Sequence, residues 1–300
     1  MTRDTNGRAG GQLSRRGLLR GVGAATVGVA GVGLGSTTAA AGKKDECEDP
    51  PLSFPRVFTR GHFETTWYGS VYITDGNTAT NYDYDGDPVP GVGGAAPDEL
   101  LLHAHGWRND YEGGICSTSQ AAATYAHEGY AHPAVGYQWD ADRGWYNATE
   151  IAERNGAKLA AFVYHYRLQH PGTTIRLSSH SLGARVVLST VEHLDAWGVY
   201  DAVESVVLLA GAADADAVAL EGRYGPSIER AAGHVENFWM NDDDVLDYAY
   251  SLGEWGTAVG AAGCDGTPPA NYTDHNVDYV PDHYSHYKED GCIHDVLATF

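Results

Sequence analysis

The sequence predicts an α/β protein whose central sheet is mostly parallel and covered by helices on both faces. Short β-branched and apolar runs alternate with helical patterns of about 10 to 20 residues over most of the chain. The strand candidate at residues 203–210 is mostly apolar, which is typical of a strand buried on both faces. The chain has 300 residues, 43% of them hydrophobic, and can therefore bury the large core that such a sheet needs.

The predicted elements follow one another in order. Near the start, β-like runs are predicted at residues 57–59 and 65–74, a turn at 75–77 and a Gly/Asp/Pro-rich loop at 76–98. Further strands are predicted at residues 99–103, 134–137, 174–177, 203–210 and 235–240. Helices are predicted at residues 117–128, 150–169, after residue 181 and at 290–300, with an irregular stretch at 248–280.

Three aspartates alternate within the predicted loop. Asp83, Asp85 and Asp87 surround Gly86 at a spacing that suits the oxygen ligands of calcium. The pattern lacks the later glutamate of an EF-hand loop, so we expect a solvated acidic loop instead.

A strand–turn–helix pattern surrounds Ser181. Residues 179–183 nearly match G-x-S-x-G, with Ser179 in place of the first glycine. A serine hydroxyl is a poor nucleophile, so it must be exposed on a tight turn within reach of a base. The alternative is an ordinary strand–turn–helix with polar turn residues. We favour a nucleophile at Ser181.

Other strand ends carry complementary chemistry. The strand at 99–103 runs into Gly106 and Trp107, and a glycine just past a strand end allows backbone N–H groups to face a neighbouring site. An oxyanion needs two donors, and the N–H groups of Trp107 and Leu182 are the candidates. The alternative at this strand end is a glycine turn with a partly buried tryptophan.

A candidate acid and a candidate base follow later in the chain. Asp242 and Asp243 come directly after the strand at 235–240, where a carboxylate can hold a histidine, although it can equally cap a helix. His283 and His286 offer imidazoles that titrate near neutrality. The chain has 14 histidines, so most of them must have structural roles.

From about residue 56 to residue 300 the chain resembles the α/β-hydrolase superfamily, especially its small lipase-like and esterase-like members. The matching segments are residues 101–109 (LLHAHGWRN), 134–140 (AVGYQWD), 178–183 (SSHSLG), 237–246 (NFWMNDDDVL) and 282–288 (DHYSHYK). The resemblance implies an α/β-hydrolase fold and an order of nucleophile, acid and base along the chain. The implied roles are nucleophile for Ser181, acid for Asp243 with Asp242 second, base for His283 ahead of His286, and oxyanion donors for Trp107 and Leu182.

These residues predict a serine hydrolase that cleaves a small-molecule or lipid ester through an acyl-enzyme, without a metal or an organic cofactor. Two alternatives remain open. The same triad could serve an amidase, a peptidase or an acyltransferase. The protein could also be a catalytically inactive α/β-hydrolase-like protein that binds a ligand at the cell surface.

The composition is strongly acidic. Nineteen basic residues face 40 acidic ones, giving a net charge of −21, and only four of the basic residues are lysines. This balance resembles proteins of salt-loving organisms, of haloarchaeal character, where salt screens the self-repulsion of an acidic surface. The alternative is an acidic protein from an ordinary habitat. The charge argues against nucleic acid or an anionic membrane as partner.

The N-terminal segment predicts export. Arg15 and Arg16 precede a Gly/Ala/Val-rich run that ends at Ala41, which resembles a twin-arginine signal read by the twin-arginine export machinery. We therefore expect a signal peptide at residues 1–41, a linker at 42–55, one domain at 56–300 and a secreted or cell-surface protein. No second stretch is long and apolar enough to span a membrane.

Four cysteines complete the pattern, at positions 47, 116, 264 and 292. Export would permit disulfides, and four cysteines allow three complete pairings. We expect a Cys264–Cys292 bridge first, because these two flank the segment that carries His283.

Overall fold

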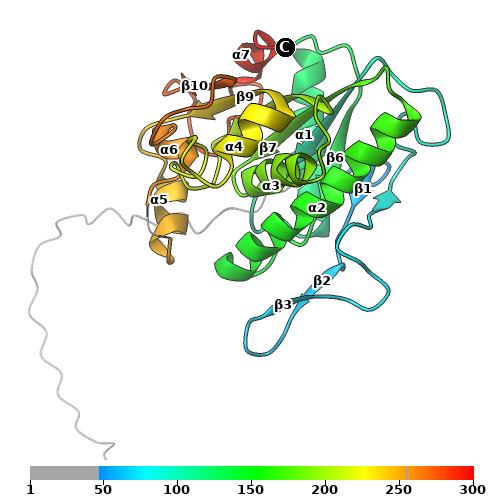
Figure 1. The fold of residues 1–300 in the computed structure, drawn as a ribbon, viewed down its shortest axis with the longest axis horizontal. Coiled ribbons are helices and arrows are strands. Elements are labelled where there is room, and N and C mark those ends of the chain that lie inside the picture. The colour runs from blue at the N-terminus through cyan, green and yellow to red at the C-terminus, as the bar shows by residue number, and fades with distance from the viewer. Residues whose placement is uncertain (1–46, 255) are drawn as a thin grey trace, which may run out of the picture. The chain divides into compact units, whose positions relative to one another are not determined.

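The computed structural model describes residues 47–254 and 256–300, and within them the main feature is one eight-stranded sheet (Figure 1). The predicted signal at residues 1–41 lies outside the described residues. From one edge to the other, the strands are β10 (Tyr272–Asn276), β9 (Ala232–Trp239), β8 (Val203–Leu209), β7 (Thr174–His180), β5 (Glu99–Ala104), β6 (Ala134–Gln138), β1 (Arg56–Phe58) and β4 (Asp83–Asp85). β4 runs antiparallel to β1, and the other neighbouring strands pair in parallel. β2 (Phe63–Thr65) and β3 (Val71–Ile73) form a separate hairpin.

Helices cover both faces of the sheet, as the sequence predicts. They are α1 (Tyr111–His127), α2 (Trp145–Gln169), α3 (Gly183–Ala196), α4 (Gly225–Ala231), α5 (Asp244–Ser251), α6 (Val259–Ala262) and α7 (Ile293–Leu297). Leu100 and Leu102 point into the core shared with α2 and α3, whereas Leu101 belongs to the core shared with α1 and α7. Alternate strand residues therefore serve two separate cores. Within the described residues, no helix has the length and apolar character needed to cross a membrane.

The parallel strands bring residues from distant parts of the sequence together at their carboxyl ends. Ser181 follows β7, Trp107 comes shortly after β5, and Asp243 comes shortly after β9. The carboxyl ends of parallel strands lie on the same side of a sheet, and ligands of open α/β sheets bind there. The sheet thereby collects the candidate residues of three separate segments.

The five strands predicted between residues 99 and 240 correspond to β5–β9, and the predicted helices to α1, α2, α3 and α7, although α1 and α2 begin six and five residues before their predicted starts. The run predicted at 65–74 is interrupted between β2 and β3, and β4, β10, α4, α5 and α6 are not among the predicted elements. β4 is three residues long and lies within the Gly/Asp-rich loop. β10 has the polar sequence YTDHN because it lies at an exposed sheet edge, and its residues do not alternate in polarity. α4 begins with glycine and proline and has only seven residues.

The expectation of a solvated loop at the three aspartates is wrong in part, because residues 83–85 form β4, although the Asp83 side chain is 64% exposed. Asp85 lies in β4 and forms an ion pair with Arg56 at 2.6 Å. Asp83 pairs with His62 at 2.9 Å. Asp87 is exposed. The first two carboxylates are thus used to hold the edge strand to the body of the domain.

The expected Cys264–Cys292 bridge is wrong. Cys47 is bonded to Cys116 of α1, with their Cα atoms 5.8 Å apart. Cys264 and Cys292 are free thiols. They cannot meet because Cys264 packs against the core on the α2/α3 face, whereas Cys292 is buried in the core on the α1/α7 face.

Candidate active site

The turn at Ser181 is tight and strained. Ser181 has a φ of 52°, a left-handed conformation that costs a non-glycine residue about 1–3 kcal/mol. Its N–H donates to the carbonyl of Leu209 at 3.0 Å, and its own carbonyl accepts from the N–H of Ala212 at 2.9 Å. Position 183 has room only for glycine, since a Cβ there would lie 2.4 Å from the carbonyl oxygen of Ala104. The surrounding strands therefore hold the turn in its strained conformation.

The departure from G-x-S-x-G at Ser179 is accommodated. The Ser179 side chain is buried, and its hydroxyl donates to the carbonyl of Val207 on β8 at 3.1 Å. A Cβ at this position fits between the strands, so the turn keeps its shape without the first glycine.

Asp243 and His283 form a buried pair. The Nδ1–H of His283 donates to Oδ2 of Asp243 at 2.7 Å, and the two residues are only 3% and 2% exposed. The other carboxylate oxygen caps α5 by accepting from the N–H groups of Val245 and Leu246 at 3.1 and 3.0 Å. Asp243 therefore holds a histidine and caps a helix, the two roles that the sequence allows for it.

The ionised form of Asp243 is favoured. Burial opposes the charge, but attraction and hydrogen bonding from His283 outweigh it, together with the N–H of Leu246, so the pKa of the carboxyl is lowered. The carboxylate fixes the tautomer of His283 with the proton on Nδ1, leaving Nε2 as an acceptor. A neutral imidazole of this kind can take a proton from a hydroxyl group.

The second choices for acid and base occupy other positions. Asp242 has a φ of 57° and an exposed side chain, so the turn directs it to solvent. His286 is fully buried, and its Nδ1–H donates to the carbonyl oxygen of His283 at 3.2 Å. The acid–base contact is thus made by Asp243 and His283.

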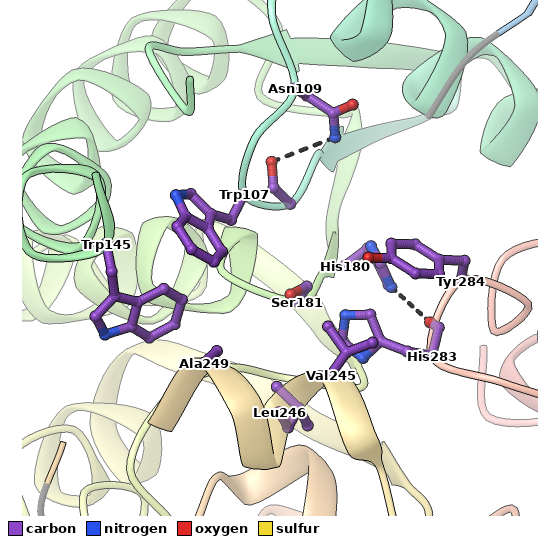
Figure 2. A pocket seen from close by; sticks show the side chains of 11 residues that line it. Trp107, Asn109, Trp145, His180, Ser181, Val245, Leu246, Ala249, His283 and Tyr284 are labelled. Atoms are coloured by element: carbon purple, nitrogen blue, oxygen red, sulfur yellow. Dashed lines mark hydrogen bonds between the residues drawn. The ribbon is translucent and has the colours of Figure 1, made fainter. Parts of the chain in front are cut away.

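A cavity joins the candidate residues. It has an enclosed volume of about 20 Å³ and is lined by Ser181, His283, Trp107 and Gly106 among others (Figure 2). The Ser181 hydroxyl makes no hydrogen bond to any residue in the described part of the chain, His283 included. Catalytic hydrogen bonds are often long or misaligned without substrate and tighten when it binds.

Two backbone N–H groups beside Ser181 are free to act as oxyanion donors. Neither the N–H of Trp107 nor that of Leu182 donates to an acceptor among the described residues. The loop that carries Gly106 passes close over the turn at Ser181, since a Cβ on Gly106 would lie 3.0 Å from the Cβ of Ser181. Unpaired N–H groups next to a serine are what a developing oxyanion needs.

The chain is similar to a known protein family. Residues 93–271 match the family described as "Alpha/beta hydrolase of unknown function (DUF900)". The chain belongs to this α/β-hydrolase family. The matched segment contains Trp107, Ser181 and Asp243 and ends before His283. Comparison with curated proteins gives no match.

Several solved structures are similar to this hydrolase. A Bacillus licheniformis lipase is 16% identical over 67% of this chain and 91% of its own, with a TM-score of 0.41. A Pyrobaculum calidifontis esterase is 11% identical over 67% of this chain and 75% of its own, with a TM-score of 0.38. A Trichoderma reesei cutinase in complex with a phosphonate inhibitor is 18% identical over 38% of this chain, with a TM-score of 0.31, and the match spans only 52% of the cutinase.

Trp145 and His180 are among the cavity residues of this hydrolase that were not singled out from the sequence. Trp145 begins α2, packs edge-on against Trp107 at 5.0 Å and donates its indole N–H to Glu254 at 3.0 Å. His180 lies directly before Ser181 and contacts the backbone of His283. Aromatic residues are equally common in cores, so the sequence offered no way to assign Trp145, whereas the position of His180 beside the nucleophile candidate Ser181 was a usable signal.

Proposed function

We propose that this hydrolase is an exported serine esterase in which Ser181, His283 and Asp243 form the catalytic triad. The observation that carries the proposal is the buried Asp243–His283 pair, which lines the same cavity as the strained Ser181 turn. A serine with an oriented imidazole and two free N–H donors is the arrangement that acyl transfer requires.

The proposed reaction has two steps. In the first, the Ser181 oxygen bonds to the ester carbonyl carbon while Nε2 of His283 takes the hydroxyl proton, and the N–H groups of Trp107 and Leu182 stabilise the oxyanion. The carbon–alkoxide bond then breaks, and the alcohol leaves with the proton from His283. In the second step, water attacks the acyl-enzyme with His283 as base, releasing the acid and restoring Ser181.

The walls of the cavity favour a small acyl group. The leaving alcohol must lie beside His283, so the acyl chain is directed to the other side of Ser181, toward Trp107, Trp145 and Ala249 (Figure 2). This side is apolar, which suits a hydrocarbon chain. The enclosed volume of the cavity is only about 20 Å³, far below the roughly 300–1,000 Å³ of typical ligand sites. We therefore expect short acyl esters to react faster than long ones.

The proposal of export has support apart from the N-terminal sequence. The Cys47–Cys116 disulfide fits an oxidising compartment, because cytosolic thiols are normally kept reduced. The net charge of −21 fits a protein that works in high salt.

Replacing the proposed nucleophile is the direct test. We expect Ser181→Ala to lower kcat on p-nitrophenyl acetate and butyrate in high salt by about 10⁴-fold or more, without lowering Tm. Ser189→Ala, which removes a buried hydroxyl from α3, is the matched control and should retain activity. Turnover that survives in Ser181→Ala would refute the triad. Parallel assays on p-nitroanilides test the amidase alternative.

A further inference from the structure

The loop that carries His283 contains no helix or strand. Residues 281–292, here called the base loop, consist of turns and bends. The His283 ring is tied to Asp243 on its Nδ1 side, which fixes the ring but not the backbone from which it extends. An imidazole that must reach a hydroxyl needs its backbone fixed too, because a 1 Å misplacement can cost about 10²-fold in rate.

The backbone of His283 is held from the nucleophile side. Nε2–H of His180 donates to the carbonyl oxygen of His283 at 2.8 Å (Figure 2). The two imidazole rings also lie 4.7 Å apart, centroid to centroid. His180 is the last residue of β7, in register with Leu209 of β8, so the donor is fixed by the sheet. His286 adds a second donor to the same oxygen at 3.2 Å from within the base loop.

The contact with the His283 carbonyl defines the protonation state of His180. A carbonyl oxygen only accepts hydrogen bonds, so Nε2 of His180 must carry the proton. Burial, followed by the neighbouring charge of His283, lowers the pKa of His180 well below its ordinary value, so the ring is neutral and does not repel a protonated His283.

We propose that His180 is a positioning residue that couples the base loop to the nucleophile turn, residues 179–183. Its hydrogen bond joins the carbonyl of His283 to the residue that precedes Ser181 in the chain. The positions of the nucleophile and of the base are therefore both fixed by the end of β7. This inference rests on the proposed function. It adds a residue that acts through the backbone of His283 and not on the reacting atoms.

The test compares two replacements of His180. His180→Leu removes the donor, whereas His180→Gln keeps an N–H near the position of Nε2. On p-nitrophenyl butyrate we expect His180→Leu to lower kcat about 10- to 100-fold with KM within twofold, and His180→Gln to recover most of the loss. His62→Leu, which removes a buried histidine whose hydrogen bonds go to Asp83 and Lys158, controls for general destabilisation. The inference is wrong if His180→Gln and His180→Leu lose activity equally, or if His180→Leu keeps full kcat.

A second readout does not depend on ester turnover. The proton between Nδ1 of His283 and Asp243 can be observed by ¹H NMR in the unmodified protein. We expect His180→Leu to broaden or shift this resonance and His180→Gln to preserve it. If the wild-type protein cleaves no ester yet this pattern is seen, the proposed function fails while the coupling stands. An identical resonance in all three proteins would overturn the coupling.

Discussion

The nucleophile turn (residues 179–183) and the base loop hold their reactive side chains by different means. The turn is fixed by close packing, with Gly183 pressed against Ala104 and Ser181 in a left-handed conformation. The base loop has no regular structure and is fixed by hydrogen bonds to buried partners. Steric changes should therefore damage the turn, whereas loss of single donors or acceptors should damage the base loop.

The largest effect is expected at the acceptor that holds the His283 ring. Asparagine also caps helices well, so Asp243→Asn should keep α5 while losing the tautomer control of His283. We expect kcat to fall about 10³- to 10⁴-fold with little change in Tm. Asp242→Asn is the matched control, because Asp242 is exposed. Equal losses in the two variants would show that the acid has been misassigned.

Added volume is expected to disrupt the turn. In Gly183→Val, the Cβ would meet the carbonyl oxygens of Ala104 and His105 at 2.4 and 2.9 Å. We expect a loss of about 1–3 kcal/mol in the free energy of unfolding and at least a 100-fold loss of kcat/KM. Gly94→Ala, where a new Cβ meets nothing within 4 Å, should leave both unchanged. Urea titration and ester assays measure the two effects, and a fully active Gly183→Val would contradict the packing argument.

Acid is expected to weaken the junction between the two regions through its buried histidines. Burial lowers the pKa of His103 and of His105 to about 3 and, with the charge of His283, that of His286 to about 4. Their unfolded pKa is about 6.5, so between pH 6.5 and 4 the unfolded state binds more protons. Stability is complete above pH 6.5 and is lost as pH falls, by up to about 1.4 kcal/mol per pH unit for each histidine.

This pH dependence can be measured by urea unfolding at fixed high salt. His103→Leu should reduce the slope of unfolding free energy against pH by about 1.4 kcal/mol per unit near pH 5. An unchanged slope in this variant would contradict a neutral, buried His103.

The smallest effect on activity is expected from the disulfide, which lies outside both regions. Cys47 and Cys116 are 69 residues apart, a loop whose closure stabilises the folded chain by about 4 kcal/mol. Cys47→Ser should lower Tm but keep kcat within twofold. A large loss of kcat would show that the disulfide also shapes the site.

The contrast between the two regions also explains how far the sequence could predict the site. The turn is local, so spacing around Ser181 predicts its strand, its helix and its nucleophile candidate. Asp243 faces inward and Asp242 outward because Asp242 adopts a left-handed backbone conformation. Spacing alone does not predict which of the two carboxylates faces inward. His180 meets His283 across 103 positions of sequence, a distance at which periodicity carries no information. The cysteine pairing failed for the same reason, because it depends on which face of the sheet each thiol occupies.

The central claim is that His283 makes Ser181 reactive at the carboxyl ends of the parallel strands. Labelling the intact protein in high salt with a fluorophosphonate, then mapping the modified residue by mass spectrometry, tests it most directly. The account predicts a single modification on Ser181 that disappears in His283→Ala. Labelling at another residue, or no labelling of a folded wild-type protein, would contradict it.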